Sequence, residues 1–209
     1  LSFKKTVKAT APFLGPRFIT VIPNLLVKQR NDLGSARRWG DAAMTRSELN
    51  GCLPFLGGGI SQVALVVENL DRAVEHYWKV FGIGPWHFYS YGKPLLKRMS
   101  YKGKPAEFSM RIAMAQVGSL NLELIEMGEG PTVYADSVTK HGFGVHHLGV
   151  QVDDAEAAIA LAKEAGIEML QDGSGFGCEG DGHFAYLDTE EAIGIMIELR
   201  EAPRRRYPP

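Results

Sequence analysis

The sequence predicts an α+β fold in which two paired βαβββ modules form one curved mixed sheet. Three observations support this prediction. The order of one strand, one helix and three strands occurs twice along the chain. The segment at 60–74 (ISQVALVVENLDRAV) matches the segment at 145–159 (VHHLGVQVDDAEAAI) at an offset of 85 residues. Each copy closes with an apolar strand that contains one glutamate. A repeat is placed before any single element because it determines the architecture of the whole chain.

The first module covers residues 59–130. Residues 60–67 are rich in Val and Leu, which predicts a strand. A helix follows, capped by Asn69 or Asp71 and ended by Gly82, because polar caps and a terminal glycine mark helix boundaries. Its apolar positions recur at three- and four-residue spacings, which predicts a buried face of Ala73, Val74, Tyr77, Trp78 and Phe81. The three strands that complete the module are expected at 86–91, 108–117 and 120–127.

A linker helix at 131–144 leads into the second module, which covers residues 145–200. Its first strand is expected at 145–152. Asp153 or Asp154 then caps a helix that Gly166 stops. The apolar positions of this helix are Ala157, Ile159, Ala160, Leu161 and Ala165. The remaining strands are expected at 167–170, 183–187 and 194–199.

Composition excludes several classes of protein. The chain has 209 residues and a net charge of −1, so it has no global positive field for nucleic acid. It has no apolar run of roughly 18 residues that would cross a bilayer. Two cysteines are too few for a disulfide framework, and we expect a cytoplasmic protein.

Charge is distributed unevenly along this balanced chain. Residues 1–50 carry nine basic and three acidic side chains, whereas residues 145–200 carry twelve acidic and two basic ones. We therefore treat residues 1–58 as a basic N-terminal extension and residues 201–209 as a basic tail. The extension is either a solvated arm or a segment that docks on an acidic face, and we expect a homodimer.

Two glutamates and two first-strand polar residues occupy matching places in the modules. Glu123 and Glu198 lie in near-continuous apolar strands, where a carboxylate must pair, become neutral or bind a metal. Gln62 and His147 lie in the two first strands, one repeat apart. Alone, each glutamate fits an outward-pointing edge residue and the histidine fits a hydrogen-bonded core residue. Their repetition favours one shared cation such as Zn, Ni, Co or Mn, with His146 pointing away from the site.

Three segments resemble one family of proteins. Residues 144–153 (GVHHLGVQVD), 122–126 (LELIE) and 197–199 (IEL) are similar to strands of methylmalonyl-CoA epimerase. That enzyme belongs to the vicinal oxygen chelate superfamily, with glyoxalase I, extradiol dioxygenases and bleomycin-resistance proteins. The resemblance covers about residues 59–200 and implies a divalent metal held between the modules. Its ligands would be Gln62, Glu123, His147 and Glu198.

One ligand departs from the epimerase pattern. Gln62 stands where those enzymes usually carry histidine, and some glyoxalase I enzymes use glutamine there. The same glutamine argues against an extradiol dioxygenase, whose iron site needs two histidines and one carboxylate.

The resemblance implies a metal-dependent isomerase or epimerase that removes a proton α to a carbonyl. Its small-molecule partner would be a carbonyl compound or a thioester such as an acyl-CoA. Glu198 is expected to act as metal ligand and base, with Glu107 or Glu123 as the second proton carrier. The alternatives are a glyoxalase I-like lyase and a ligand-binding protein of the bleomycin-resistance type that catalyses nothing.

Overall fold

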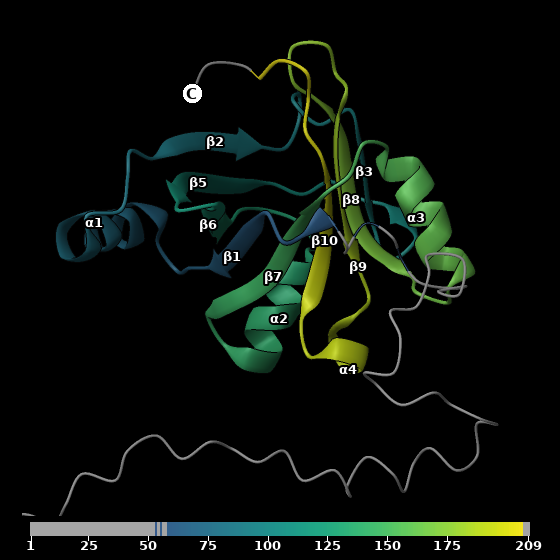
Figure 1. Cartoon of the computed structure of the whole chain (residues 1–209), viewed down its shortest axis with the longest axis horizontal. Coiled ribbons are helices and arrows are strands. Elements are labelled where there is room, and N and C mark those ends of the chain that lie inside the picture. Colours follow the sequence, from purple (N-terminus) through teal and green to yellow (C-terminus); the bar gives the residue numbers. More distant parts are fainter. Residues whose placement is uncertain (1–52, 54, 56–57, 207–209) are drawn as a thin grey trace, which may run out of the picture. The chain divides into compact units, whose positions relative to one another are not determined.

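Ten strands form one curled mixed sheet, a half-barrel with its helices on the outside (Figure 1). The computed structural model describes residues 53, 55 and 58–206. The strand order is β2-β5-β6-β1-β7-β10-β9-β8-β3-β4. Apart from residues 53, 55 and 58, the expected extension at 1–58 lies outside the described residues. No helix of the described part is both long and apolar enough to cross a membrane.

The predicted repeat is confirmed by the topology. The first module supplies the neighbouring strands β2-β5-β6-β1. The second supplies β7-β10-β9-β8, which are the equivalent strands in reverse order across the sheet. The two modules join where β1 pairs with β7 in antiparallel fashion. The first module contains β1 (Gln62–Val66), α1 (Leu70–Phe81), β2 (His87–Tyr91), β5 (Met110–Val117) and β6 (Leu120–Met127). The linker and the second module contain α2 (Val133–His141), β7 (Gly144–Gln151), α3 (Ala155–Glu164), β8 (Met169–Phe176), β9 (Gly182–Leu187), α4 (Glu190–Ile193) and β10 (Met196–Glu201).

A short hairpin inside the first module was not predicted. It consists of β3 (Arg98–Tyr101) and β4 (Lys104–Pro105), and β3 pairs with β8 of the other module. The first module thereby contributes the far edge of the second module's half of the sheet. The strand signal is weak because basic residues interrupt the run at 97–104 and only Met99 in it is buried.

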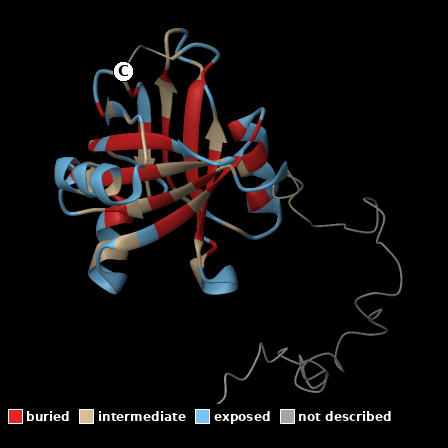
Figure 2. Cartoon of the chain, turned by 60° about the vertical axis from the view of Figure 1, so that its left-hand side comes forward, coloured by how far each residue is buried: buried red, intermediate tan, exposed pale blue. Residues whose placement is uncertain are grey.

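The two outer helices begin where the sequence predicts. Asn69 accepts a hydrogen bond from the Arg72 amide at the start of α1, and Asp154 accepts one from the Ala157 amide at the start of α3. The predicted face of α1 is only partly right, because Trp78 is 57% exposed and Phe81 is 63% exposed. Figure 2 shows largely exposed helices around strands that are mostly buried. The residues of α1 that pack on β5 and β6 are Leu70, Ala73, Val74 and Tyr77.

The buried face of α3 also differs from the prediction. Its buried positions are Ala155, Ala158 and Ala162, at spacings of three and four residues, and Leu161 is exposed. Small side chains let this helix lie close to the outer face of β9 and β10. The concave face of the sheet is thus left to the other side chains of each strand.

The expected tail at 201–209 is held in place as far as it is described. Glu201 is the last residue of β10. The carbonyl of Arg205 accepts a 2.8 Å hydrogen bond from the Cys178 amide, and the Arg204 amide donates to Asp181. These contacts hold residues 204–206 against the loop between β8 and β9.

Candidate metal centre

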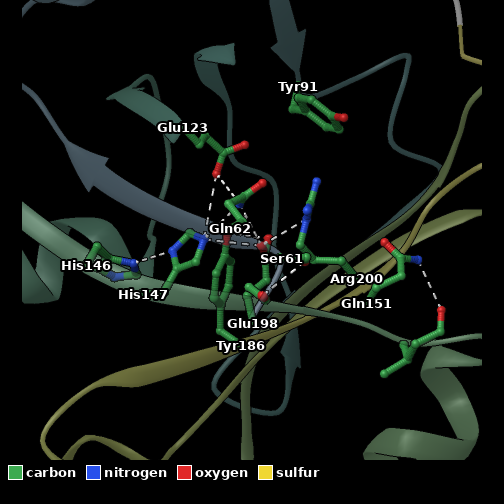
Figure 3. Close-up of polar contacts among 12 residues, drawn as sticks. Ser61, Gln62, Tyr91, Glu123, His146, His147, Gln151, Tyr186, Glu198 and Arg200 are labelled. Atoms are coloured by element: carbon green, nitrogen blue, oxygen red, sulfur yellow. Dashed lines mark hydrogen bonds and ion pairs between the residues drawn. The ribbon is translucent and has the colours of Figure 1, made fainter. Parts of the chain in front are cut away.

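The register of the four central strands brings the predicted ligands together. In one row across the sheet, Glu123 pairs with Ala64, and Ala64 pairs with His147. In the next row, Gly149 lies between Gln62 and Glu198. The middle position of each row is therefore a small residue, which leaves room above the sheet for four long side chains to converge (Figure 3).

Position 149 has no room for a side chain and therefore requires glycine. A Cβ atom there would lie 2.8 Å from Cδ of Arg200 and 2.9 Å from Cβ of Gln62, closer than real contacts allow. The same offset of 85 residues that aligns Gln62 with His147 aligns Ala64 with Gly149. The repeat thus reproduces both the ligand positions and the small positions that separate them.

The four side chains form one buried group, here called the central cluster: Gln62, Glu123, His147 and Glu198. All four are at most 6% exposed. His147 Nε2 lies 3.2 Å from Glu198 Oε2 and 3.7 Å from Glu123 Oε2. Glu123, His147 and Glu198 each offer one ligand atom, and these three atoms all lie within 4.8 Å of one another. This spacing suits a shared cation.

The amide of Gln62 occupies the middle of the central cluster. Its Nε2 lies 2.9 Å from Glu123 Oε2, 3.1 Å from Glu198 Oε2 and 3.3 Å from His147 Nε2. The amide oxygen, Oε1, is buried without a hydrogen-bond partner among the described residues. Such an orphaned acceptor costs about 1–3 kcal/mol. If the amide turns over, Oε1 joins the two carboxylates and the imidazole, and the four donors together fit a divalent cation.

Two buried carboxylates without a metal cannot both be charged cheaply. Burial and the nearby charge of Glu198 raise the pKa of Glu123 to about 7. Burial also disfavours the charged form of Glu198. However, His147, Arg200 and the Tyr186 hydroxyl outweigh burial and hold the pKa of Glu198 below its usual value. Glu198 is therefore the ionised member of the pair near neutral pH, and Glu123 is the member that carries a proton.

Two tyrosine hydroxyls in a hydrogen-bonded row hold the Glu198 carboxylate in place. The Tyr186 hydroxyl donates a 3.0 Å hydrogen bond to Glu198 Oε1, and the Tyr134 hydroxyl lies 2.6 Å from that of Tyr186. Both tyrosines are almost fully buried, and burial raises the pKa of each well above its ordinary value. They therefore remain neutral, and Tyr186 leaves Glu198 Oε2 directed at the cluster.

His146 does not point away from the site as expected. The pairing of β1 with β7 shifts between Ala64 and Leu65, so that His146 is an extra residue in a bulge of β7. A bulge interrupts the alternation of side chains along a strand. The Nδ1 atoms of His146 and His147 lie 2.9 Å apart, and His146 Nε2 lies 3.4 Å from the Val133 carbonyl.

With a metal in the cluster, these contacts favour one tautomer of each ring. Burial and the neighbouring His147 lower the pKa of His146 to about 3, so His146 is neutral. A neutral His146 that donates through Nε2 to Val133 accepts at Nδ1 from His147. His147 then carries its hydrogen on Nδ1 and presents an unprotonated Nε2 to the cluster, which is the form that binds metals.

The structure does not bring Glu107 to the cluster. Its side chain is 70% exposed and pairs with Lys93, ahead of β5. The strand itself presents Met110, Ile112 and Met114 to the concave side, so it supplies no carboxylate there. Sequence reasoning missed two residues beside the cluster, Arg200 and Arg206. Arg200 had a detectable signal, because it lies two residues after Glu198 and therefore on the same face of its strand.

The raised pKa of Glu123 predicts how the metal-free protein responds to pH. A folded-state pKa of about 7 lies above the ordinary value of 4.5, so the folded protein keeps a proton that the unfolded chain loses. The stability from this group is complete below about pH 4.5 and is lost as pH rises to about 7. We expect the free energy of unfolding of chelator-treated protein to fall by about 1 kcal/mol between pH 6 and pH 8.

The control is Glu123→Gln, which removes the titrating group and keeps its shape. Its stability should change less over this pH range than that of the unchanged protein, and denaturant unfolding at the two pH values measures both. An equal change in the two proteins would show that Glu123 does not titrate in this range, and would contradict the prediction.

Comparison with known proteins adds a family and two kinds of relative. A family model described as the glyoxalase/bleomycin resistance protein/dioxygenase superfamily matches residues 61–186. The mitochondrial methylmalonyl-CoA epimerases of Mus musculus and Homo sapiens are each 23% identical over 146 residues. These alignments cover 69% of this chain and 74% of each relative.

A solved structure shares the fold. It is a Streptomyces coelicolor methylmalonyl-CoA epimerase variant in complex with 2-nitronate-propionyl-CoA, with a TM-score of 0.50 and 21% identity. The match covers 72% of this chain and 98% of that one.

Proposed function

The chain belongs to the glyoxalase/bleomycin resistance protein/dioxygenase superfamily, and from this premise we propose that it is a divalent-metal-dependent isomerase. In this proposal it removes and returns a proton α to the carbonyl of a small acyl compound, as an epimerase does. An acyl-CoA thioester is the proposed substrate, because relatives at 23% identity are named as methylmalonyl-CoA epimerases. The observation that carries the proposal is the convergence of four buried ligand side chains beside a concave cavity.

The metal's contribution is electrostatic. A divalent cation in the central cluster would polarise the substrate carbonyl and make the α-hydrogen more acidic. Zn, Ni, Co and Mn all accept the oxygen and imidazole donors of the cluster. The buried tyrosines and the apolar side chains of β5 exclude water from this side of the cavity.

Glu198 is the proposed base. Its Oε2 faces the cluster, and Arg200 and Tyr186 hold the carboxylate ionised and in one orientation. A base must be unprotonated and fixed within hydrogen-bond reach of the proton that it removes. The proton taken from the α-carbon goes to a Glu198 oxygen.

Glu123 is the proposed proton donor on the other side of the cluster. It would return a proton to the α-carbon on the face opposite Glu198, and take one from that face in the reverse direction. It replaces Glu107 in this role, because Glu107 is paired with Lys93 at the surface. Two carboxylates whose environments push their pKa values apart are the usual arrangement of an acid and a base.

A glyoxalase I-like lyase remains the second candidate, favoured by the glutamine at position 62. It uses the same steps of proton removal and return on a different substrate. A binding protein without catalysis explains less, because it has no use for two buried glutamates that face one another.

The test is exchange of the substrate α-hydrogen with solvent deuterium, followed by mass spectrometry. The panel is methylmalonyl-CoA, ethylmalonyl-CoA and the glutathione hemithioacetal of methylglyoxal. We expect metal-loaded protein to incorporate deuterium into a CoA ester, and chelator-treated protein to do so at least about 100-fold more slowly. Conversion of the hemithioacetal alone would indicate the lyase. Absence of exchange in all three with metal-loaded protein would contradict the proposal.

A further inference from the structure

Two arginines lie between the central cluster and a polar cavity. The cavity has a volume of about 310 Å³, and its polar lining consists of His87, Tyr89, Gln116, Asn121, Arg200 and Arg206. Among the described residues, no carboxylate lines it. A smaller cavity of about 30 Å³ is lined by Glu198 and by the same two arginines. The arginines therefore belong to both spaces.

Arg200 is buried beside the base. It lies two residues after Glu198 on β10, and its side chain is 14% exposed. Its Nε lies 3.4 Å from Glu198 Oε2, while the rest of the guanidinium extends away from the cluster toward Tyr91 (Figure 3). The absence of a side chain at Gly149 makes room for the arginine's aliphatic part. One edge of the guanidinium thus holds the base, and the other edge is directed at the cavity.

Arg206 approaches the same space from the end of the chain. Its guanidinium lies 5.9 Å from the centre of the Tyr89 ring, and its Nη1 lies 3.5 Å from the Tyr91 hydroxyl. The described part of the chain gives Arg206 no carboxylate partner. By contrast, Arg98, Arg111 and Arg204 all pair with acidic side chains at the surface.

Charge arithmetic favours an anionic ligand. With the divalent cation of the proposed function bound, Glu123 and Glu198 are both ionised. The cation and the two arginines then carry four positive charges against three negative ones from Glu123, Glu198 and Glu201, which leaves an excess of positive charge. An anion next to two guanidinium groups in a partly buried cavity gains strong charge-assisted hydrogen bonds. Arginine suits this role because its planar fork matches the two oxygens of a carboxylate.

We propose that Arg200 and Arg206 form an oxyanion site that selects substrates with a negative group next to the reacting carbonyl. The 3.4 Å contact between Arg200 and Glu198 places this site close to the base, which favours a carboxylate on the acyl group itself. A phosphate of a carrier would bring the same oxyanion chemistry. The inference rests on the proposed function for the reaction but not for the binding of the anion.

The test is calorimetric titration of the purified protein, with the metal content measured on the same samples. The probes are malonate, neutral malonamide and inorganic phosphate. Malonate should bind, malonamide should bind far more weakly, and Arg206→Gln should weaken malonate binding by about 10- to 100-fold, as for loss of one charge-assisted contact. Arg206→Lys should recover part of the loss, because it restores the charge without the fork.

The matched control is Arg204→Gln. Arg204 is 84% exposed, lies two residues away and pairs with Asp181, so its loss should leave malonate binding unchanged. Equal malonate binding by Arg206→Gln and the unchanged protein would overturn the site, as would no binding of malonate or phosphate at all. Binding of phosphate alone, if it depends on Arg206, would overturn the carboxylate assignment and assign the anion to a carrier.

Deuterium exchange on the same variants separates this inference from the proposed function. If exchange is absent but malonate binding still depends on Arg206, the reaction is wrong and the site stands. If exchange is present but Arg206→Gln binds malonate as tightly as the unchanged protein, the oxyanion site is wrong and the proposed reaction stands.

Discussion

Replacing His147 or Glu198 with alanine is expected to abolish metal binding and α-proton exchange together. Each substitution removes one of three side chains whose ligand atoms lie within 4.8 Å of one another. Metal affinity should fall by more than about 100-fold, since loss of a supporting contact outside the ligand shell alone costs 10- to 100-fold. We expect the unchanged protein to hold about one metal per chain, which elemental analysis after dialysis against Zn, Ni, Co or Mn would measure.

Gln62→Ala should have a smaller effect than either substitution. A neutral amide adds little charge to a site that already holds two carboxylates, and the alanine also removes the orphaned oxygen. Gln62→His should raise metal affinity, because imidazole is a stronger ligand than an amide oxygen. Weaker binding in Gln62→His would mean that position 62 does not contact the metal.

Gln171→Ala is the matched control for these ligand variants. Gln171 is also fully buried, but its Oε1 accepts a hydrogen bond from the Val133 amide, and it has no hydrogen bond to any of the four cluster side chains. This variant should lose stability and keep its metal. Equal metal loss at positions 62, 147 and 171 would show that burial, rather than ligation, explains the effects.

The sequence allowed the sheet and the cluster to be predicted for one reason, which is the repeat. Aligning Gln62 with His147 and Glu123 with Glu198 needed no knowledge of the fold, and the same register then brings all four together. Each glutamate is the single acidic residue of an apolar strand core, and this pattern predicted that it is buried. The helix caps at Asn69 and Asp154 could be read because they depend on local hydrogen bonds only.

Features that depend on distant parts of the chain could not be predicted. The bulge that turns His146 toward His147 depends on the pairing of β1 with β7, across more than 80 residues. The β3–β4 hairpin pairs with the other module, so nothing near it in sequence signals a partner. Arg206 resembled part of a solvated basic tail because its contacts with Tyr89 and Tyr91 lie more than 110 residues away.

The repeat also explains why one sheet can hold an acid and a base. The modules place equivalent glutamates at equivalent positions, yet the surroundings are not equivalent. Only Glu198 has the Tyr186 hydroxyl and Arg200 beside it, because the second module alone supplies them. Among the described residues, Glu123 accepts a side-chain hydrogen bond only from the Gln62 amide, which also donates to Glu198. Divergence around matching ligands thus gives the two carboxylates of the metal-free protein different pKa values.

Glu198→Asp is expected to keep the metal and to lose most of the exchange activity on one isomer of a chiral acyl thioester. Aspartate preserves the charge but withdraws the carboxylate by one methylene. Its contact with the Tyr186 hydroxyl at 3.0 Å then stretches, as does its approach to the substrate α-carbon. A misplacement of about 1 Å costs on the order of 100-fold in rate, so exchange should fall by at least that factor. Metal affinity should change by about 10-fold or less, because a carboxylate remains.

Glu123→Asp is the matched control, since it shortens the equivalent ligand in the other module. With one carboxylate on each side of the α-carbon, each base removes the proton of one substrate isomer. Glu198→Asp should therefore slow exchange of one isomer of a chiral acyl thioester, and Glu123→Asp should slow exchange of the other. Separate assays of the two isomers, with metal content measured in parallel, give this comparison. If both variants slow the same isomer, or neither slows exchange while metal is retained, the two-carboxylate mechanism is wrong.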